Sequence, residues 1–231
     1  MKRKSFIALL ILCTTTFFLS TGMLIHNDLD AKRQVESYNQ LISIVENVDL
    51  SDIDVLPFDE DSDFIAKYQE LHKQKGDMVG WIKIDDTQIN YPVMQTIENP
   101  NYYLRRGFDK NYSLYGCPYV QETCDISKPS DNIVIYGHHM NDGSMFANLM
   151  KYTKKSFWEK HKTITFDTLN KHSEYEVFAT FKTTAYGDDS TSFKYYRFVE
   201  AKDEQEFNSF IDKCKELALY DTGITPNMGI S

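Results

Sequence analysis

The most distinctive hydrophobic pattern lies at the N-terminus. Residues Ser5–Ile25 contain no charged side chain, and the basic cluster Lys2, Arg3 and Lys4 precedes them. About 20 apolar residues in a helix span the hydrocarbon core of a bilayer. A cleaved signal peptide is the alternative, but its apolar region is usually shorter and ends in a small-x-small site, which is absent here. We therefore predict a cytoplasmic tail (residues 1–4), a transmembrane signal-anchor (5–25) and an extracellular remainder, because basic residues stay inside.

Helical periodicity follows the apolar segment. Apolar residues recur at helical spacing from Asp30 to Val48, which predicts an amphipathic helix. An acidic stretch with Pro57 interrupts the pattern, and a second apolar helical face runs from Phe64 to Leu71. Residues 26–75 are thus expected to form a helical N-terminal extension.

From Gly76 onward the pattern changes to short runs rich in β-branched and aromatic residues, which are typical of strands. A short helix is expected from Ser144 to Tyr152, and a longer one from Glu204 to Leu219 with Asp203 and Glu206 as a capping pair. Residues 76–231 are therefore predicted to form one mainly β domain with helices in its connections, and irregular strand spacing favours a barrel over a βαβ sheet. The expected strands are 79–84, 88–94, 132–136, 163–166 and 174–186.

Charge and cysteine content narrow the class of protein. Beyond Ile25 there are 22 Lys and Arg residues against 34 Asp and Glu residues, a net charge of −12. This acidic balance argues against nucleic-acid binding. Cys117 and Cys124 are close enough in sequence to form a disulfide, which an extracellular location permits. The cysteines, which also include Cys13 and Cys214, have no metal-site spacing, so neither a metal nor another cofactor is expected.

The candidate chemistry lies in "DNIVIYGHHMNDGSMF", where an apolar strand runs into His138 and His139. The two imidazoles could simply complete the strand by hydrogen bonding. A metal site would need further ligands, which no His-x-x-x-His or carboxylate spacing supplies. The third reading is proton transfer or partnership with a nucleophile, for which imidazole is favoured near neutral pH.

Four strings, in order, resemble the class B sortases: "GWIKIDDTQINYPVMQ", "NPNYYLRRGF", "NIVIYGHHMNDGSMFANL" and "LYDTGI". The resemblance implies a closed β-barrel and a membrane-anchored cysteine transpeptidase of Gram-positive bacteria. Its partners would be a secreted protein with a C-terminal sorting signal and a peptidoglycan cross-bridge amine. By motif position the family's catalytic histidine is His138, and Tyr136 and Leu104 would line the substrate groove. Core packing is the alternative role for both.

One departure from the family pattern bears on activity. The family's cysteine follows a Thr-Leu-x-Thr-Cys strand and its arginine lies on the last strand, but neither motif occurs in these residues. The expectation is a barrel that lacks its last strands, truncated at the C-terminus by an interrupted frame or by design, and inactive as given. Cys117, Cys124, Arg197 and the pair Arg105-Arg106 are substitutes by residue type alone, and packing or surface roles are favoured for them.

Two other functions stay open from the sequence. One is a non-catalytic sortase-like surface protein that binds sorting signals or an envelope partner. The other is an anchored structural module in which the histidines serve only the fold.

Overall fold

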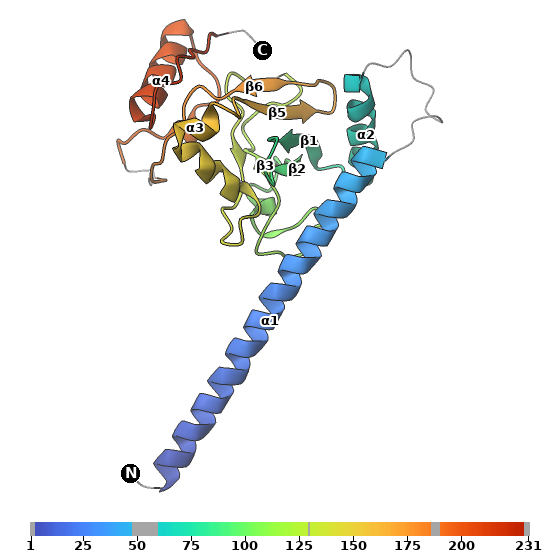
Figure 1. The fold of residues 1–231 in the computed structure, drawn as a ribbon, viewed down its shortest axis with the longest axis vertical. Helices are drawn as coiled ribbons and strands as arrows, with labels where there is room; N and C mark the ends of the chain where they lie inside the picture. The colour runs from blue at the N-terminus through green and yellow to red at the C-terminus, as the bar shows by residue number, and fades with distance from the viewer. Residues whose placement is uncertain (1–2, 48–59, 129, 186–189, 229–231) are drawn as a thin grey trace.

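The computed structural model describes residues 3–47, 60–128, 130–185 and 190–228. A six-stranded sheet, in the order β4-β3-β2-β1-β5-β6, forms the body of the domain. A single long helix runs down from one side of this body (Figure 1). The strands are β1 (Met78–Lys83), β2 (Asn90–Met94), β3 (Tyr119–Val120), β4 (Ile135–Tyr136), β5 (Thr163–Thr168) and β6 (Glu174–Glu176).

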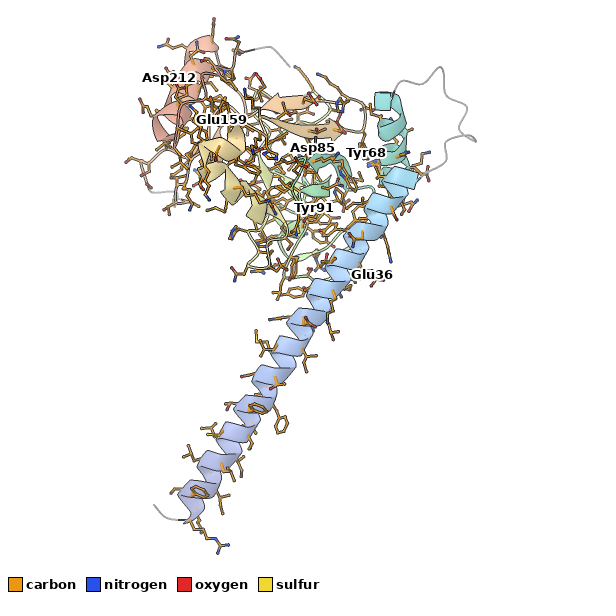
Figure 2. All side chains as sticks on the ribbon, viewed as in Figure 1. Glu36, Tyr68, Asp85, Tyr91, Glu159 and Asp212 are labelled. Carbon is orange, nitrogen blue, oxygen red and sulfur yellow. The ribbon has the colours of Figure 1, made fainter. Side chains whose placement is uncertain are left out.

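The long helix α1 (Arg3–Asn47) joins the apolar segment and the first predicted helix without a break. Its lower half is exposed except for the half-buried Thr21, and it extends away from the domain, as Figure 2 shows. By length and composition this helix is able to cross a membrane. Its upper half buries Tyr38, Leu41 and Val45 against the domain. The anchor candidate and the brace of the domain are therefore one element.

The second predicted helix is confirmed as α2 (Glu60–Gln74). Tyr68 stacks on Trp81 of β1, with ring centroids 5.6 Å apart and an interplanar angle of 10°. Leu71 is also fully buried, so α2 packs on both α1 and β1. The acidic stretch around Pro57, expected to separate the two helices, lies outside the described residues.

The sheet begins with an antiparallel hairpin of β1 and β2, whose connection passes through Asp86 in the left-handed region (φ 56°). β5 pairs antiparallel with the other side of β1, which makes β1 a central strand and explains why Trp81 and Ile82 are buried. β3 pairs with β2 in parallel and with β4 antiparallel. The sheet curls into a half-barrel with β4 and β6 at its edges.

The long strand predicted at 174–186 is mostly wrong. Within the described part of this range only β6 forms, because the chain from Val177 to Ala185 has single hydrogen-bond partners instead of a neighbouring strand. Trp158 Nε1 donates to the Val177 carbonyl at 2.8 Å, and the Leu219 amide donates to the Thr180 carbonyl at 2.8 Å. The high β-propensity of these residues favours an extended backbone, but a strand also needs a neighbouring strand to pair with.

The connections hold the remaining helices. The predicted C-terminal helix is confirmed as α4 (Glu204–Leu217), and Asp203 Oδ1 accepts the Glu206 amide at 2.8 Å. The helix expected from Ser144 is instead a 3₁₀ helix, η2 (Phe146–Thr153). Ser144 does not cap it, because its hydroxyl donates to Asp142. The other short helices are η1 (Tyr102–Arg105), α3 (Lys155–Trp158) and η3 (Tyr195–Arg197).

Candidate active site

His138 lies two residues beyond β4, half-buried at the edge of the sheet. Its Nε2 is 2.7 Å from the carbonyl oxygen of Leu104 in η1. A carbonyl oxygen only accepts hydrogen bonds, so Nε2 must carry the proton of this contact. Nδ1 has no hydrogen-bond partner among the described residues and is therefore the nitrogen left to exchange a proton with a reacting group.

Gly137 lets the histidine segment lie close to η2. A Cβ built on Gly137 would be 2.4 Å from the Phe146 ring, closer than side chains tolerate. The Phe146 amide also donates to the His138 carbonyl at 2.8 Å. The glycine before the histidine is thus explained by packing, and Phe146 fixes the backbone on which His138 sits.

Replacement of Gly137 by alanine is expected to destabilise the protein by about 1–3 kcal/mol, because the added methyl overpacks against the Phe146 ring. Thermal unfolding and the NMR signals of the His138 ring measure the two consequences. Gly76→Ala is the matched control, since nothing lies within 4 Å of its added Cβ. Equal effects of the two substitutions would show that the Phe146 contact does not fix the histidine segment.

The Leu104 carbonyl that contacts His138 also packs against Gly116. Gly116, in the left-handed region (φ 61°), lies so close that an added Cβ would be 2.7 Å from the Leu104 oxygen. The Gly116 carbonyl accepts the buried Tyr38 hydroxyl of α1 at 2.9 Å. Tyr38 therefore connects α1 to the hydrogen-bond partner of His138.

The same tyrosine also supports the turn that follows the histidines. The Tyr38 ring packs edge-on against Tyr91, at 5.0 Å between centroids. The Tyr91 hydroxyl in turn accepts the Met145 amide at 3.1 Å, and Met145 bridges to His139. Figure 2 shows Tyr91 in the body of the domain beside α1. The sequence pattern placed Tyr38 on a helix face but gave no signal for this role.

Asp142 closes the turn after His139. It accepts the Tyr115 hydroxyl at 2.7 Å, and the Ser144 amide and hydroxyl at 2.9 and 2.6 Å. Burial alone would raise the pKa of Asp142, but these hydrogen bonds outweigh it and lower the pKa below its usual value. Asp142 is therefore ionised at neutral pH, and its charge is used to hold the turn.

The two predicted groove residues lie near His138 in different ways. Leu104 touches His138 through its carbonyl, and with 40% of the residue exposed it is not a core residue. Tyr136 is half-buried in β4, with its ring 5.3 Å from that of Tyr119 and its hydroxyl 3.4 Å from Gln121 Oε1. Burial raises the pKa of Tyr136, so its hydroxyl stays protonated.

The four cysteines are free thiols, so the possible Cys117–Cys124 disulfide is not formed. Burial raises the pKa of Cys117 to about 12 and that of Cys214 to about 11. Burial likewise raises the pKa of Cys124, whose sulfur approaches the Asn132 carbonyl at 3.6 Å. Thiols with raised pKa values stay protonated and are poor nucleophiles. None of them has a contact with His138 in the described part of the chain.

The other candidates also have structural partners. Arg105 donates to the Leu114 carbonyl at 3.2 Å, and Arg106 donates to the Lys110 carbonyl at 3.1 Å. Arg197 lies in η3, where its backbone amide donates to the Lys194 carbonyl at 2.9 Å. No group of three or more potential metal ligands occurs among the described residues.

The outer edge of β4 is largely open. Before the strand, the Asn132 amide donates to the Val199 carbonyl at 3.0 Å. Along Ile135–Tyr136, β3 is the one ladder partner within the described residues. Apolar residues Ile133 to Tyr136 are only half-buried, although such side chains usually lie in a core. The site is thus built on one side by η1 and η2, and on the other side β4 has no further ladder partner among the described residues.

Comparison with known proteins identifies the family to which this fold and site belong. A family model described as "Sortase domain" matches residues 82–207, more than half of the chain. The chain belongs to the sortase family. It is 34% identical to Sortase B of Staphylococcus aureus over 160 residues and 34% identical to Sortase B of Listeria monocytogenes over 156 residues. Each alignment covers 68% of this chain but only 62% and 60% of the respective relative.

The structural likeness extends further than the sequence alignments. The solved S. aureus sortase B–substrate complex superposes with a TM-score of 0.73 and 27% identity, covering 86% of this chain and 85% of that chain. The class B resemblance and the sortase fold are therefore both confirmed. The matched residues include β4 and His138, so this histidine lies inside the sortase domain.

Proposed function

We propose that this protein is a class B sortase-type transpeptidase, which cleaves a C-terminal sorting signal of a secreted protein through a thioester and transfers the protein to a cell-wall amine. The observation that carries the proposal is His138, held at the open edge of a sortase half-barrel by the Leu104 carbonyl at 2.7 Å. Membership of the family and two sortase B relatives support the reaction class.

His138 is the catalytic histidine in this proposal. With Nε2 engaged by Leu104, Nδ1 faces the reaction. Protonated at Nδ1, the ring favours a neighbouring thiolate, and it then gives that proton to the departing amine when the thiolate attacks the peptide carbonyl. An incoming amine then attacks the thioester carbonyl, gives a proton to the ring and releases the thiolate as the amide bond forms. The fixed Leu104 contact keeps the ring oriented through both half-reactions.

The sulfur nucleophile and the arginine lie outside residues 1–231 in this proposal. Cys117, Cys124 and Cys214 are buried thiols that lack a contact with His138, and Cys13 lies in the apolar half of α1. Residues 1–231 by themselves are then inactive. The open edge of β4, next to His138, is the natural place for a further strand, because it offers unpaired backbone groups.

Tyr136 and Leu104 are proposed to contact the sorting signal. Tyr136 lies two residues before His138, and Leu104 is the hydrogen-bond partner of His138. Residues 5–25 are proposed to anchor the protein in the cell membrane, with the basic N-terminal tail in the cytoplasm and the sortase domain outside. The apolar lower half of α1 supports this placement.

Thioester trapping tests the proposed function. Residues 1–231 are incubated with peptides from the C-terminal sorting signals encoded in the same genome, and intact mass is measured. No adduct is expected. A longer form, translated from the source DNA beyond Ser231 and carrying a Thr-Leu-x-Thr-Cys strand, is expected to form one. An adduct on Cys117 or Cys124 would overturn the assignment of the nucleophile, and an inert longer form would overturn the transpeptidase.

The open β4 edge favours one second candidate, a non-catalytic protein that binds sorting signals. An exposed strand edge takes up an extended peptide by adding it as a strand. In the same experiment this function would give saturable peptide binding without an adduct in every form of the chain.

A further inference from the structure

A cavity of about 470 Å³ lies where α1 leaves the sortase domain, and His138 is not among its lining residues. One wall is α1 and the other is the loop that connects η1 to β3. The α1 residues recur at spacings of three and four, so they share the helix face that looks toward the loop. The lining residues are His26, Leu29, Asp30 and Arg33 from α1, and Asn111 and Tyr112 from the loop.

Hydrogen bonds fix the shape of this cavity. Arg33 Nη2 donates to Asp30 Oδ1 at 2.6 Å and to the Tyr112 carbonyl at 2.7 Å. The other oxygen of Asp30 accepts the Leu114 amide at 2.9 Å and the Ser113 hydroxyl at 3.2 Å. The charge of Asp30 is therefore compensated on both oxygens.

Arg33 keeps donors for a ligand. Its Nε and Nη1 have no hydrogen-bond partner in the described part of the chain, and 48% of its side chain is exposed. His26, one helical turn before Asp30, is exposed and also has no described hydrogen bond. A pre-positioned guanidinium with free donors next to an imidazole is suited to a phosphate group, which accepts several hydrogen bonds at once.

The position of the cavity along α1 indicates which kind of molecule would carry such a phosphate group. Ser5–Ile25 in a helix is about 31 Å long, close to the hydrocarbon thickness of a bilayer, and the headgroup layer adds about 5–7 Å on each side. His26 to Asp30 lie about 2–8 Å beyond Ile25 and so fall within this layer. Arg33 is one turn higher, but side chains tilt toward the helix N-terminus, which brings its guanidinium down toward the headgroups.

The apolar residues of the cavity fit the same depth. Leu29 is 59% exposed and Tyr112 is 55% exposed, although both are large and apolar. Tyrosine is enriched where headgroups meet the acyl chains, because its ring is apolar and its hydroxyl is polar. Both residues would be covered by lipid once Ser5–Ile25 spans the bilayer.

We propose that this cavity binds the phosphodiester headgroup of one anionic phospholipid, with Arg33 and His26 as donors and with Leu29 and Tyr112 beside the start of the acyl chains. The proposal rests on the membrane span proposed above and not on the transpeptidase reaction. The bound lipid would hold the loop Arg106–Tyr115 at the membrane surface. That loop leads directly from Leu104, the partner of His138, to Gly116, so the lipid would fix the height of the site above the bilayer.

The test uses the full chain purified in dodecyl maltoside and titrated with dioctanoyl phosphatidylglycerol, with native mass spectrometry to count bound lipid. One saturable site is expected. Arg33→Gln is expected to weaken binding about tenfold or more, the usual effect of losing charge-assisted hydrogen bonds. His26→Gln leaves the Asp30–Arg33 contact intact and is expected to weaken binding several-fold, so the test holds even if the Arg33 variant misfolds.

Lys32→Gln is the matched control. It removes the same charge from the preceding residue of α1, where Lys32 pairs with Asp28 at 2.7 Å and its side chain is 71% exposed. An effect below about twofold is expected, because exposed charges contribute little. The proposal is overturned if Lys32→Gln weakens binding as much as Arg33→Gln, if both cavity variants bind normally, or if inorganic phosphate displaces the lipid at equal concentration. Release of the chain from membranes by alkaline carbonate would instead contradict the span itself.

Discussion

Replacement of His138 by glutamine, in a form of the protein that carries the family's cysteine, is expected to lower the rate of transpeptidation about 10²–10⁴-fold. Glutamine retains an N–H donor for the Leu104 carbonyl but cannot take up or release a proton. The loss should appear in kcat rather than in KM, because the peptide contacts remain. Release of the cleaved peptide and formation of the amide product, followed by liquid chromatography, measure both half-reactions.

His139→Gln is the matched control for this prediction. His139 is the adjacent residue, is more exposed, and has no side-chain hydrogen bond to another described residue. Its substitution is expected to change the rate less than about twofold, as for an exposed side chain outside the reaction. If the two variants lose activity equally, the imidazole at position 138 does not transfer the proton. An unchanged unfolding midpoint for His138→Gln is needed to separate loss of chemistry from loss of fold.

Replacement of Asp30 by alanine is expected to destabilise the sortase domain by about 2–4 kcal/mol, because it leaves two buried or half-buried donors unsatisfied. The carboxylate is buried and accepts the Leu114 amide and the Ser113 hydroxyl across 84 and 83 residues of chain. Arg33 would also lose its partner, but it is half-exposed and can regain water. Urea unfolding of the full chain in micelles, followed by near-UV circular dichroism, measures the effect.

Asp28→Ala is the control on the same turn of α1. Asp28 is 61% exposed and pairs only with Lys32 among the described residues, so its loss is expected to cost less than about 1 kcal/mol. A small effect for both variants would mean that α1 is merely attached to the domain. A large effect at Asp30 alone would establish that the helix beyond the proposed membrane span is part of the fold that supports His138.

The sequence was sufficient for features that depend on neighbouring residues. The uncharged run Ser5–Ile25 indicated an apolar helix, and short runs rich in β-branched and aromatic residues located β1 and β2. The Asp203 cap marked the start of α4. In each case the periodicity or the cap is contained in one short segment, so no distant contact is needed to identify it. The four sortase-like strings by themselves also indicated the family.

The sequence was less reliable where a local preference needed a distant partner. Residues 174–186 have strong β-propensity, yet only Glu174–Glu176 pair, because β5 continues beside them for just that length. The spacing of Cys117 and Cys124 permitted a disulfide, whereas tertiary packing directs their sulfurs toward the Pro92 and Asn132 carbonyls. The β-propensity of a segment and the spacing of its cysteines limit the structures it can form, and the residues packed against it determine which of them forms.

By itself the sequence determined that the chain has an apolar N-terminal helix, a sortase-like β domain and a histidine directly after a strand, since each follows from local pattern. Only the tertiary structure decided that the Leu104 carbonyl engages Nε2 of His138, that Tyr38 of α1 supports this contact, and that three of the cysteines are buried thiols. The physical reason is that hydrogen bonds and burial join residues tens of positions apart, and no local pattern of side chains encodes which of those residues meet.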